Sequence, residues 1–383
     1  MVDFRLTEEQ EAVRKLAREF ALNEMRPVAR QYDESEEFPW PIIEKAHEVG
    51  LLNSVIPEEY GGVGADKMME CLIAEELFYG CAGMGTSLMA NNLALTPIIL
   101  GGNEEQKKRF LTPFVEKPIM GAFCLTEPGA GSDAASLRTR AVRDGDSYII
   151  NGTKQFITNG SVASYYVVFA TVNPELRHKG ITAFVIPRDT PGISIGKVEH
   201  KMGQRASDTA QVVFEDVRVP VENRLGEEGD GWGIAMRTLD ASRAGIAASA
   251  VGIAQAAFDD ARRYALERKQ FGQPIANFQA IQFMLADMAI KIETARLAVW
   301  KAAWLWDTGK PSSKASSIAK AYATDIAMQV TTDAVQIFGG YGYTREFMVE
   351  KYMRDAKLMQ IYEGTNQIQR LVIARHILKE VMG

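Results

Sequence analysis

The fold class is decided by residues 148–171, which read YIINGTKQFITNGSVASYYVVFAT. Runs rich in Tyr, Ile, Val and Phe favour strands, and the Asn-Gly pairs between them are typical of tight turns. Similar runs follow, so the sequence predicts an antiparallel β barrel or sandwich. Strands are expected at 148–150, 164–171, 181–187 and 211–219, with a hairpin over 139–151.

The residues on both sides of this segment follow the period of helices instead. A capping box at Thr7-Glu8-Glu9-Gln10 begins a helix that ends near Pro27. Further helices are expected at 66–78, 84–100, 234–269, 277–308 and 313–337, and the last three have the short connections of a bundle. The sequence therefore predicts an α+β protein with a helical domain at 1–120, a β domain at 121–233 and a helical bundle at 234–383.

Composition excludes several classes of function. The 383 residues include 43 Lys+Arg against 49 Asp+Glu, and the net charge of −6 offers no footprint for nucleic acid. Cys71, Cys81 and Cys124 lack CxxC spacing and the four histidines are scattered, so buried thiols are expected and no metal site. Since we find neither a signal peptide nor an apolar span, we expect a cytoplasmic protein without a membrane span.

The loop at 122–133, AFCLTEPGAGSD, is rich in hydroxyls, glycines and acids. Residues 129–134 match GxGxxA, but we reject a dinucleotide fingerprint because a hairpin follows where that motif needs a helix. A plain turn remains the alternative, and the hydroxyls favour contact with a cofactor. On the next strand, alternation predicts Phe156 and Thr158 on one face, where they could flank a planar ring. A lone phenylalanine is otherwise more often a core residue.

Glu363 is the candidate for acid–base chemistry. It lies among Ile361, Tyr362 and Gly364, ahead of a helix over 367–382 that Thr365 or Asn366 would cap. Apolar neighbours would raise its pKa, which suits a base that removes a weakly acidic C–H proton. The alternative is an acid stabilised by the helix dipole.

Three basic or acidic positions on the predicted bundle also have two interpretations. Arg268 either complements the dipole at the end of its helix or binds a phosphate. Asp240 and Arg243 stand at i and i+3, so they form either a surface ion pair or a contact to a ligand.

Together these residues closely resemble the acyl-CoA dehydrogenase family, especially its short- and medium-chain members. Two blocks carry the resemblance: 124–133, and 336–370 with Gly-Gly-Tyr-Gly, Arg-Asp-Ala and Ile-Tyr-Glu-Gly-Thr in order. The resemblance covers nearly the whole chain and implies a C-terminal four-helix bundle. It also implies an FAD enzyme of fatty acid β-oxidation that converts acyl-CoA to trans-2-enoyl-CoA. Glu363 would take the α-proton, hydride would pass to flavin N5, and the electrons would go to electron-transfer flavoprotein.

The resemblance assigns further residues to the site. Those implied to contact FAD are Phe123, Cys124, Leu125, Thr126, Gly131, Ser132, Phe156, Ile157, Thr158, Arg268, Phe271, Gln279, Gln336, Ile337, Gly339, Gly340, Thr365 and Gln367. Those implied to contact acyl-CoA are Ser132, Asp240, Arg243, Tyr362, Gly364, Arg375, Gly85, Met89 and Leu93. Many relatives have tryptophan at Phe156, and some place the base at Ser242, which cannot serve as one.

The resemblance also implies a homotetramer, a dimer of dimers in which Arg268 reaches a flavin across an interface. Short to medium unbranched acyl chains fit best. A dicarboxylyl chain would need a cationic partner, and the helix after Gly83 offers no arginine. Branched or cyclic acyl groups, an oxidase of the same fold, and a helical scaffold without catalysis are the alternatives.

Overall fold

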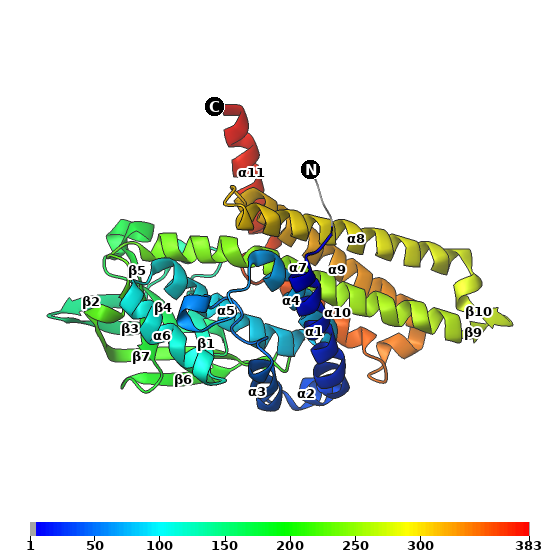
Figure 1. Cartoon of the computed structure of the whole chain (residues 1–383), viewed down its shortest axis with the longest axis horizontal. Coiled ribbons are helices and arrows are strands. Elements are labelled where there is room, and N and C mark those ends of the chain that lie inside the picture. The colour runs from blue at the N-terminus through cyan, green and yellow to red at the C-terminus, as the bar shows by residue number, and fades with distance from the viewer. Residues whose placement is uncertain (1–4, 383) are drawn as a thin grey trace.

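The computed structural model describes residues 5–382 and places the β domain beside two sets of helices (Figure 1). The capping box at Thr7 is confirmed, because its hydroxyl accepts from the N–H of Gln10, whose side chain returns to the N–H of Thr7. The first helix ends in a π-helical stretch, Ala21–Met25, before Pro27. The N-terminal helices are α1 (Glu8–Phe20), α2 (Ala29–Ser35), α3 (Trp40–Glu48), α4 (Lys67–Gly80), α5 (Ala82–Gly101) and α6 (Glu104–Glu116).

The predicted β domain is present as a sheet in the order β6-β7-β3-β2-β4-β5-β8. Its strands are β1 (Met120–Cys124), β2 (Arg140–Asp144), β3 (Ser147–Thr158), β4 (Ala163–Thr171), β5 (Ile181–Pro187), β6 (Ile193–Val198), β7 (Thr209–Pro220) and β8 (Arg224–Leu225). Most neighbours are antiparallel, and the hairpin predicted over 139–151 is formed by β2 and β3. Strand β1 departs from the prediction, because it adds to β4 in parallel.

The turn expected at Asn151-Gly152 is wrong. Strand β3 continues through this pair, and the register against β7 shifts there as it does at a bulge. The glycine is needed for close packing, since a Cβ at Gly152 would lie 2.3 Å from Thr139 Oγ1. An Asn-Gly pair thus marks a close backbone approach here.

The C-terminal helices form the predicted bundle and extend it toward the sheet. They are α7 (Gly231–Glu267), α8 (Gln279–Asp307), α9 (Ser313–Phe338), α10 (Val349–Met359) and α11 (Asn366–Met382). Helix α7 lies across the β domain at its start and within the bundle at its end (Figure 1). Its many alanines and Gly252 let α4 approach closely, because a Cβ on Gly252 would lie 2.1 Å from the Glu75 carbonyl.

Three apolar clusters hold these parts together. One joins α1, α4 and α5 to the bundle, a second lies between α5, α6, the loop after β1 and the start of α7, and a third fills the sheet. Cys71, Cys81 and Cys124 are buried thiols, as expected. Within residues 5–382, no helix is both long enough and apolar enough to span a membrane.

Candidate active site

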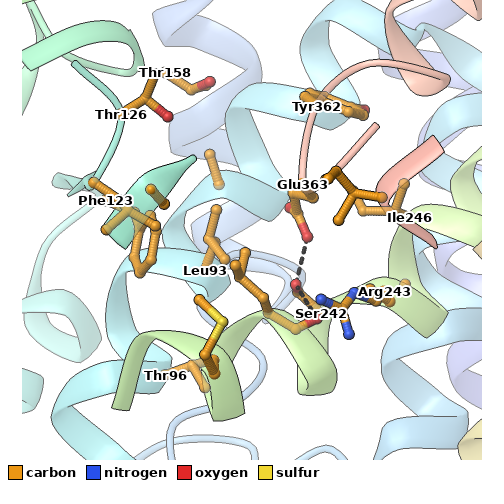
Figure 2. Close-up of a pocket in the computed structure, with 18 of the residues that line it drawn as sticks. Leu93, Thr96, Phe123, Thr126, Thr158, Ser242, Arg243, Ile246, Tyr362 and Glu363 are labelled. Atoms are coloured by element: carbon orange, nitrogen blue, oxygen red, sulfur yellow. Dashed lines mark hydrogen bonds between the residues drawn. The ribbon is translucent and has the colours of Figure 1, made fainter. Parts of the chain in front are cut away.

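A cavity of about 440 Å³ lies where the N-terminal helices, the sheet and the bundle meet. Figure 2 shows Phe123, Thr126 and Thr158 on one side of it, and Ser242 and Glu363 on the other. Of the residues predicted for the site, those lining this cavity are Met89, Leu93, Phe123, Leu125, Thr126, Gly131, Ser132, Phe156, Ile157, Thr158, Arg243, Tyr362, Glu363, Gly364 and Arg375. Positions that are distant in sequence therefore converge on one hollow.

The loop after β1 is held in place by a buried ion pair. Lys154 Nζ is fully buried and donates to Glu127 Oε1 at 2.8 Å and to the Leu125 carbonyl at 3.1 Å. The Glu127 carboxylate also accepts from the N–H groups of Arg138 and Thr139, at 2.6 and 2.9 Å. Burial alone would raise the pKa of Glu127, but the charge of Lys154 holds that pKa below its ordinary value. Glu127 is therefore a fixed carboxylate beneath the loop.

Phe156 and Thr158 both line the cavity, as alternation predicted, but the end of β3 also contains a bulge that was not predicted. Phe156 has a φ of 57° and a side chain 63% exposed, and the register against β7 shifts between Lys154 and Ile157. This bulge lets three consecutive residues, Phe156, Ile157 and Thr158, all reach the cavity. A positive φ in a non-glycine residue costs energy and is often found at functional sites.

Glu363 is carried by a left-handed turn rather than by the helix that follows. Its φ is 52°, Gly364 continues at 90°, and its carboxylate accepts a hydrogen bond from Ser242 Oγ (Figure 2). Burial raises the pKa of Glu363 above the ordinary carboxyl value. The hydrogen bond from Ser242 and the charge of Lys320 oppose this rise without cancelling it. The structure thus gives Glu363 the raised pKa that its sequence context predicted.

Behind Glu363 lies a buried lysine that the sequence reasoning missed. Lys320 Nζ donates to the Gly364 carbonyl at 2.8 Å and to Asn366 Oδ1 at 2.9 Å. Burial lowers the pKa of Lys320 to about 8, although the negative charge of Glu363 opposes that shift. Thr365 caps α11 by accepting from the N–H of Ile368 at 3.3 Å, as one of the two predicted caps would. The turn that carries Glu363 is therefore fixed from both α9 and α11.

Arg243 and Asp240 form the predicted i, i+3 ion pair, but not on an open surface. Arg243 is only 5% exposed and lines the cavity, while Asp240 also accepts from Ser313 Oγ at 3.0 Å. Arg243 Nε is buried without a partner in the described chain. A buried, unpartnered guanidinium nitrogen is a place for a ligand acceptor.

Gly85 does not line the cavity, in contrast to the prediction for the deep end. A Cβ on Gly85 would lie 2.6 Å from Phe78 Cδ2, so this glycine lets the Phe78 ring pack against α5. Phe78 lines the cavity in place of Gly85, and Thr86, which the sequence also predicts at the deep end, lines it as well. Cys124 lies among the apolar side chains inside the sheet, where strand alternation turns it away from Phe123.

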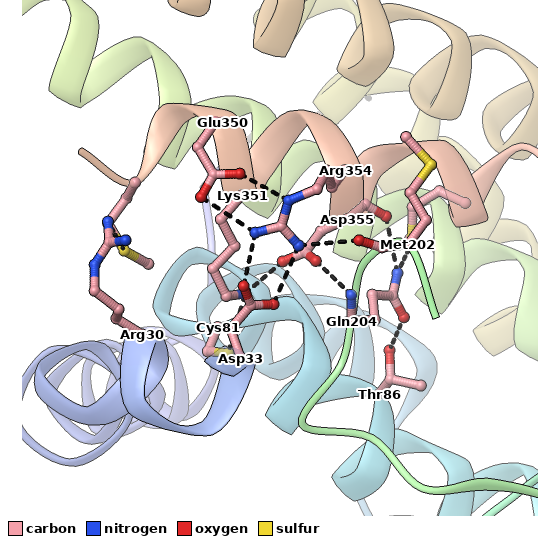
Figure 3. A network of polar contacts seen from close by, with 12 residues as sticks. Arg30, Asp33, Cys81, Thr86, Met202, Gln204, Glu350, Lys351, Arg354 and Asp355 are labelled. Carbon is pink, nitrogen blue, oxygen red and sulfur yellow. Dashed lines mark hydrogen bonds and ion pairs between the residues drawn. The ribbon is translucent and has the colours of Figure 1, made fainter. Parts of the chain in front are cut away.

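A network of polar contacts joins the three parts of the chain (Figure 3). Arg354 on α10 pairs with Asp33 at 2.6 Å and donates to the Met202 carbonyl at 3.0 Å, so it touches all three parts of the chain. Gln204 Nε2 donates to the Asp355 carbonyl at 3.1 Å, and its Oε1 accepts from Thr86 Oγ1 at 2.7 Å. The Arg-Asp pair of the second sequence block thus organises the domain junction.

Several of the remaining predicted residues lie in a second hollow, away from Glu363. Arg268, Ile337, Gly339 and Gly340 line this hollow, where the Arg268 guanidinium lies 5.4 Å from the centre of the Tyr341 ring. Phe271 stands 93% exposed in the short β9 (Lys269–Gln270) to β10 (Gln273–Pro274) connection. Other predicted residues line neither hollow: Gln279, Gln336, Thr365, Gln367 and Asp240. The structure therefore places one set of predicted contacts in the cavity, a second set in the other hollow, and leaves the rest outside both.

Comparison with known proteins matches nearly the whole length of the chain. The family models for the acyl-CoA dehydrogenase N-terminal, middle and C-terminal domains match residues 7–117, 122–217 and 229–378. The chain is 49% identical over 379 residues to the short-chain specific acyl-CoA dehydrogenase of Clostridium acetobutylicum, covering 99% of this chain and 100% of that protein.

Two solved structures show the same similarity in three dimensions. Butyryl-CoA dehydrogenase from Megasphaera elsdenii superposes with a TM-score of 0.96 at 46% identity, over 98% of this chain and 100% of that chain. A chain in the structure of the electron transferring flavoprotein of Acidaminococcus fermentans has a TM-score of 0.97 at 50% identity, with the same coverage.

Proposed function

Because the chain belongs to the acyl-CoA dehydrogenase family, we propose that it oxidises a short-chain acyl-CoA to the trans-2-enoyl-CoA with Glu363 as the base. The observation that supports this most directly is the position of the Glu363 carboxylate. It faces Thr126 and Thr158 across the cavity, which leaves room for a substrate between base and cofactor (Figure 2).

The cavity wall opposite Glu363 suits the flavin of FAD. Phe156 offers an accessible ring, and the hydroxyls of Thr126 and Thr158 lie at the same wall. Gly131 adds open space, since a Cβ there would meet no atom within 4 Å. We infer that these residues hold the isoalloxazine, which when bound supplies the acceptor for the hydride that leaves Cβ.

Glu363 then performs the proton half of the reaction. Its carboxylate takes the α-proton while the Cβ–H electron pair leaves as hydride, so a C=C bond forms and the two substrate hydrogens are accounted for. A pKa raised by burial makes Glu363 a stronger base than an exposed carboxylate. The hydrogen bond from Ser242 orients this carboxylate. The backbone N–H of Glu363 is our candidate to stabilise the charge that develops on the thioester oxygen.

We assign the CoA portion to the side of the cavity where Ser132, Arg243 and Arg375 lie. Ser132 and Arg375 are exposed, as contacts to a large polar group must be, whereas Arg243 offers its unpartnered Nε from within. We propose electron-transfer flavoprotein as the electron acceptor, because one similar chain comes from the structure of an electron transferring flavoprotein. Reduced, buried cysteines are consistent with a cytoplasmic location.

The second hollow supports a homotetramer. Arg268, Gly339 and Gly340 are not near Glu363, yet a guanidinium beside exposed glycine backbone suits a pyrophosphate. We propose that this hollow receives part of the FAD of a neighbouring subunit, to which the exposed Phe271 and Gln279 also reach.

An anaerobic titration of the purified holoenzyme with butyryl-CoA tests this function, with absorbance of the flavin as the readout. We expect Glu363→Gln to keep bound FAD and acyl-CoA but to reduce the flavin about 10²- to 10⁴-fold more slowly, because the base is lost. Glu380→Gln, on the surface of α11, is the control and is expected to match the unchanged protein. Near-normal flavin reduction by Glu363→Gln would assign the proton to another residue.

A further inference from the structure

The cavity is elongated along helix α7. The residues of α7 in the cavity wall form one stripe of positions three or four apart, two of which are pairs of adjacent residues: Trp232, Met236, Leu239, Ser242 with Arg243, Gly245 with Ile246, and Ser249. At 1.5 Å per residue this stripe is about 25 Å long, and Glu363 contacts it near the middle, at Ser242. The cavity therefore has one arm on each side of the base.

The two arms differ in their surroundings. Met236 and Leu239 share an apolar cluster with the loop after β1, whose Ser132 and Asp133 are exposed. Ile246 belongs instead to the cluster of α4 and the bundle, and Ser249 is buried. If the proposed function holds, the bulky CoA lies in the open arm, so the acyl chain beyond Cβ must point along the closed one.

The closed arm ends at an ion pair. Lys67 and Glu70 on α4 both line the cavity, contact each other and are 8% and 5% exposed. A Cβ added to Gly245 would lie 3.8 Å from Glu70 Oε1, which places this carboxylate about one helical turn beyond Ser242. Burial alone would lower the pKa of Lys67, but the charge of Glu70 raises it, so the lysine stays charged.

We propose that the Lys67–Glu70 ion pair sets the upper limit of acyl chain length. Each methylene that moves from water to an apolar wall favours binding, whereas one that reaches this pair must displace water from charged groups and offers no hydrogen bond in return. Only a few methylene groups fit between the base and the Glu70 carboxylate. Affinity should then stop rising with chain length where the chain meets the pair.

The pair is a poor receptor for a substrate that ends in a carboxylate. Lys67 is the cation that such a chain would need, but Glu70 already neutralises it and would repel a second anion. This arrangement favours a polar barrier to apolar chains over a recognition site for dicarboxylyl chains.

The test replaces the pair with apolar side chains and measures kcat/KM for butyryl-, hexanoyl-, octanoyl- and decanoyl-CoA. In the unchanged holoenzyme we expect kcat/KM to level off or fall early in this series. In Lys67→Met/Glu70→Leu it should continue to rise, by up to about fourfold for each added methylene. Such replacements of a buried pair are often neutral for stability, and flavin content and Tm will verify folding.

Two controls separate charge from other effects. Glu70→Gln keeps a polar barrier, so the upper limit of acyl chain length should stay where it is. Lys107→Met/Glu104→Gln removes an i, i+3 pair on α6 that does not line the cavity, and should leave the chain-length profile unchanged. An unchanged chain-length profile in the folded Lys67→Met/Glu70→Leu variant would overturn the proposal. It would also be overturned if the unchanged protein oxidised glutaryl-CoA and Lys67→Met abolished that activity. If no acyl-CoA reduces the flavin of the unchanged protein, the proposed function fails instead.

Discussion

Glu363 is an acid in surroundings that favour its neutral form, yet its proposed task requires the carboxylate. The positive charge of Lys320, one of the groups that oppose the raised pKa, lies on α9 and contacts the turn through the Gly364 carbonyl. This lysine is charged below about pH 8, the value to which burial lowers its own pKa. After burial and the hydrogen bond from Ser242, Lys320 therefore helps to set the pH at which the base becomes available.

Replacing Lys320 should shift that pH. In Lys320→Met the pKa of Glu363 rises further, because a stabilising positive charge is gone. Since the carboxylate is the active form, the increase of flavin reduction with pH should move to higher pH, as stopped-flow measurements across the pH range would show. Lys314→Met on the same helix removes only an exposed pair with Glu380 and should leave the profile unchanged. A slower reaction with an unshifted profile would reduce Lys320 to a structural role.

At the scale of elements, the site depends on a loop and a strand end that meet over one buried ion pair. Residues 124–133 contain no helix or long strand, and the Lys154–Glu127 contact crosses from β3 to hold them. The N–H of Gln155 adds a bond to the Thr126 carbonyl at 2.9 Å. The geometry of the proposed flavin wall is thus set by residues that do not face the cavity.

Lys154→Met should disturb this wall. The substitution leaves Glu127 buried without its cation, which costs about 3–5 kcal/mol. We expect a lower Tm and a smaller fraction of bound FAD after gel filtration. Arg218→Met, which breaks an exposed pair with Asp144 in the same sheet, should change stability by no more than about 0.5 kcal/mol. Full flavin content at an unchanged Tm would contradict this account of the loop.

The elements also show where sequence reasoning stops. Helices α7, α8 and α9 lie close to their predicted bounds, because apolar periodicity over 25 or more residues is a strong local signal. The bulge at Phe156 and the uninterrupted strand at Gly152 depend on contacts with β7 and Thr139, which no short window contains.

The candidate site, like the fold, was predictable from the sequence only in part. Glu363 stood out because Ile361, Tyr362 and Gly364 beside it in sequence already indicate apolar surroundings ahead of a helix, although its partner Ser242 is distant in sequence. Lys154, Lys320 and Lys67 did not, since a buried lysine looks like a surface lysine until its partner is known. Mid-helix lysines in otherwise apolar stretches, such as Lys320 among alanines, were the one available signal.

At the scale of the whole molecule, α8 presents an apolar stripe to the outside. Phe283, Ile290, Leu297 and Trp304 recur every seven residues and are 39–60% exposed. This helix lies along the outer side of the bundle (Figure 1). A large apolar face of this kind suits a second copy of the chain, in line with the proposed homotetramer.

Charge on this stripe should divide the assembly. Ile290→Glu/Leu297→Glu is expected to sediment as a smaller species, because burying two unpaired carboxylates in an apolar contact is unfavourable. Ala289→Glu, at an exposed position of the same helix that lies about 100° around the axis from Ile290, is the control and should keep the native mass. If the double variant also kept it, the stripe would lie outside the interface.

The close contact between α4 and α7 has a consequence for the newly made chain. Nearly every residue of α4 is buried, and its cover includes α7, which ends at Glu267. At 5–20 residues per second, the ribosome needs about 10 to 40 s to add the stretch from α4 to the end of α7. During that interval an apolar helix is exposed without its partner, so chaperones are most needed before the last third of the chain emerges.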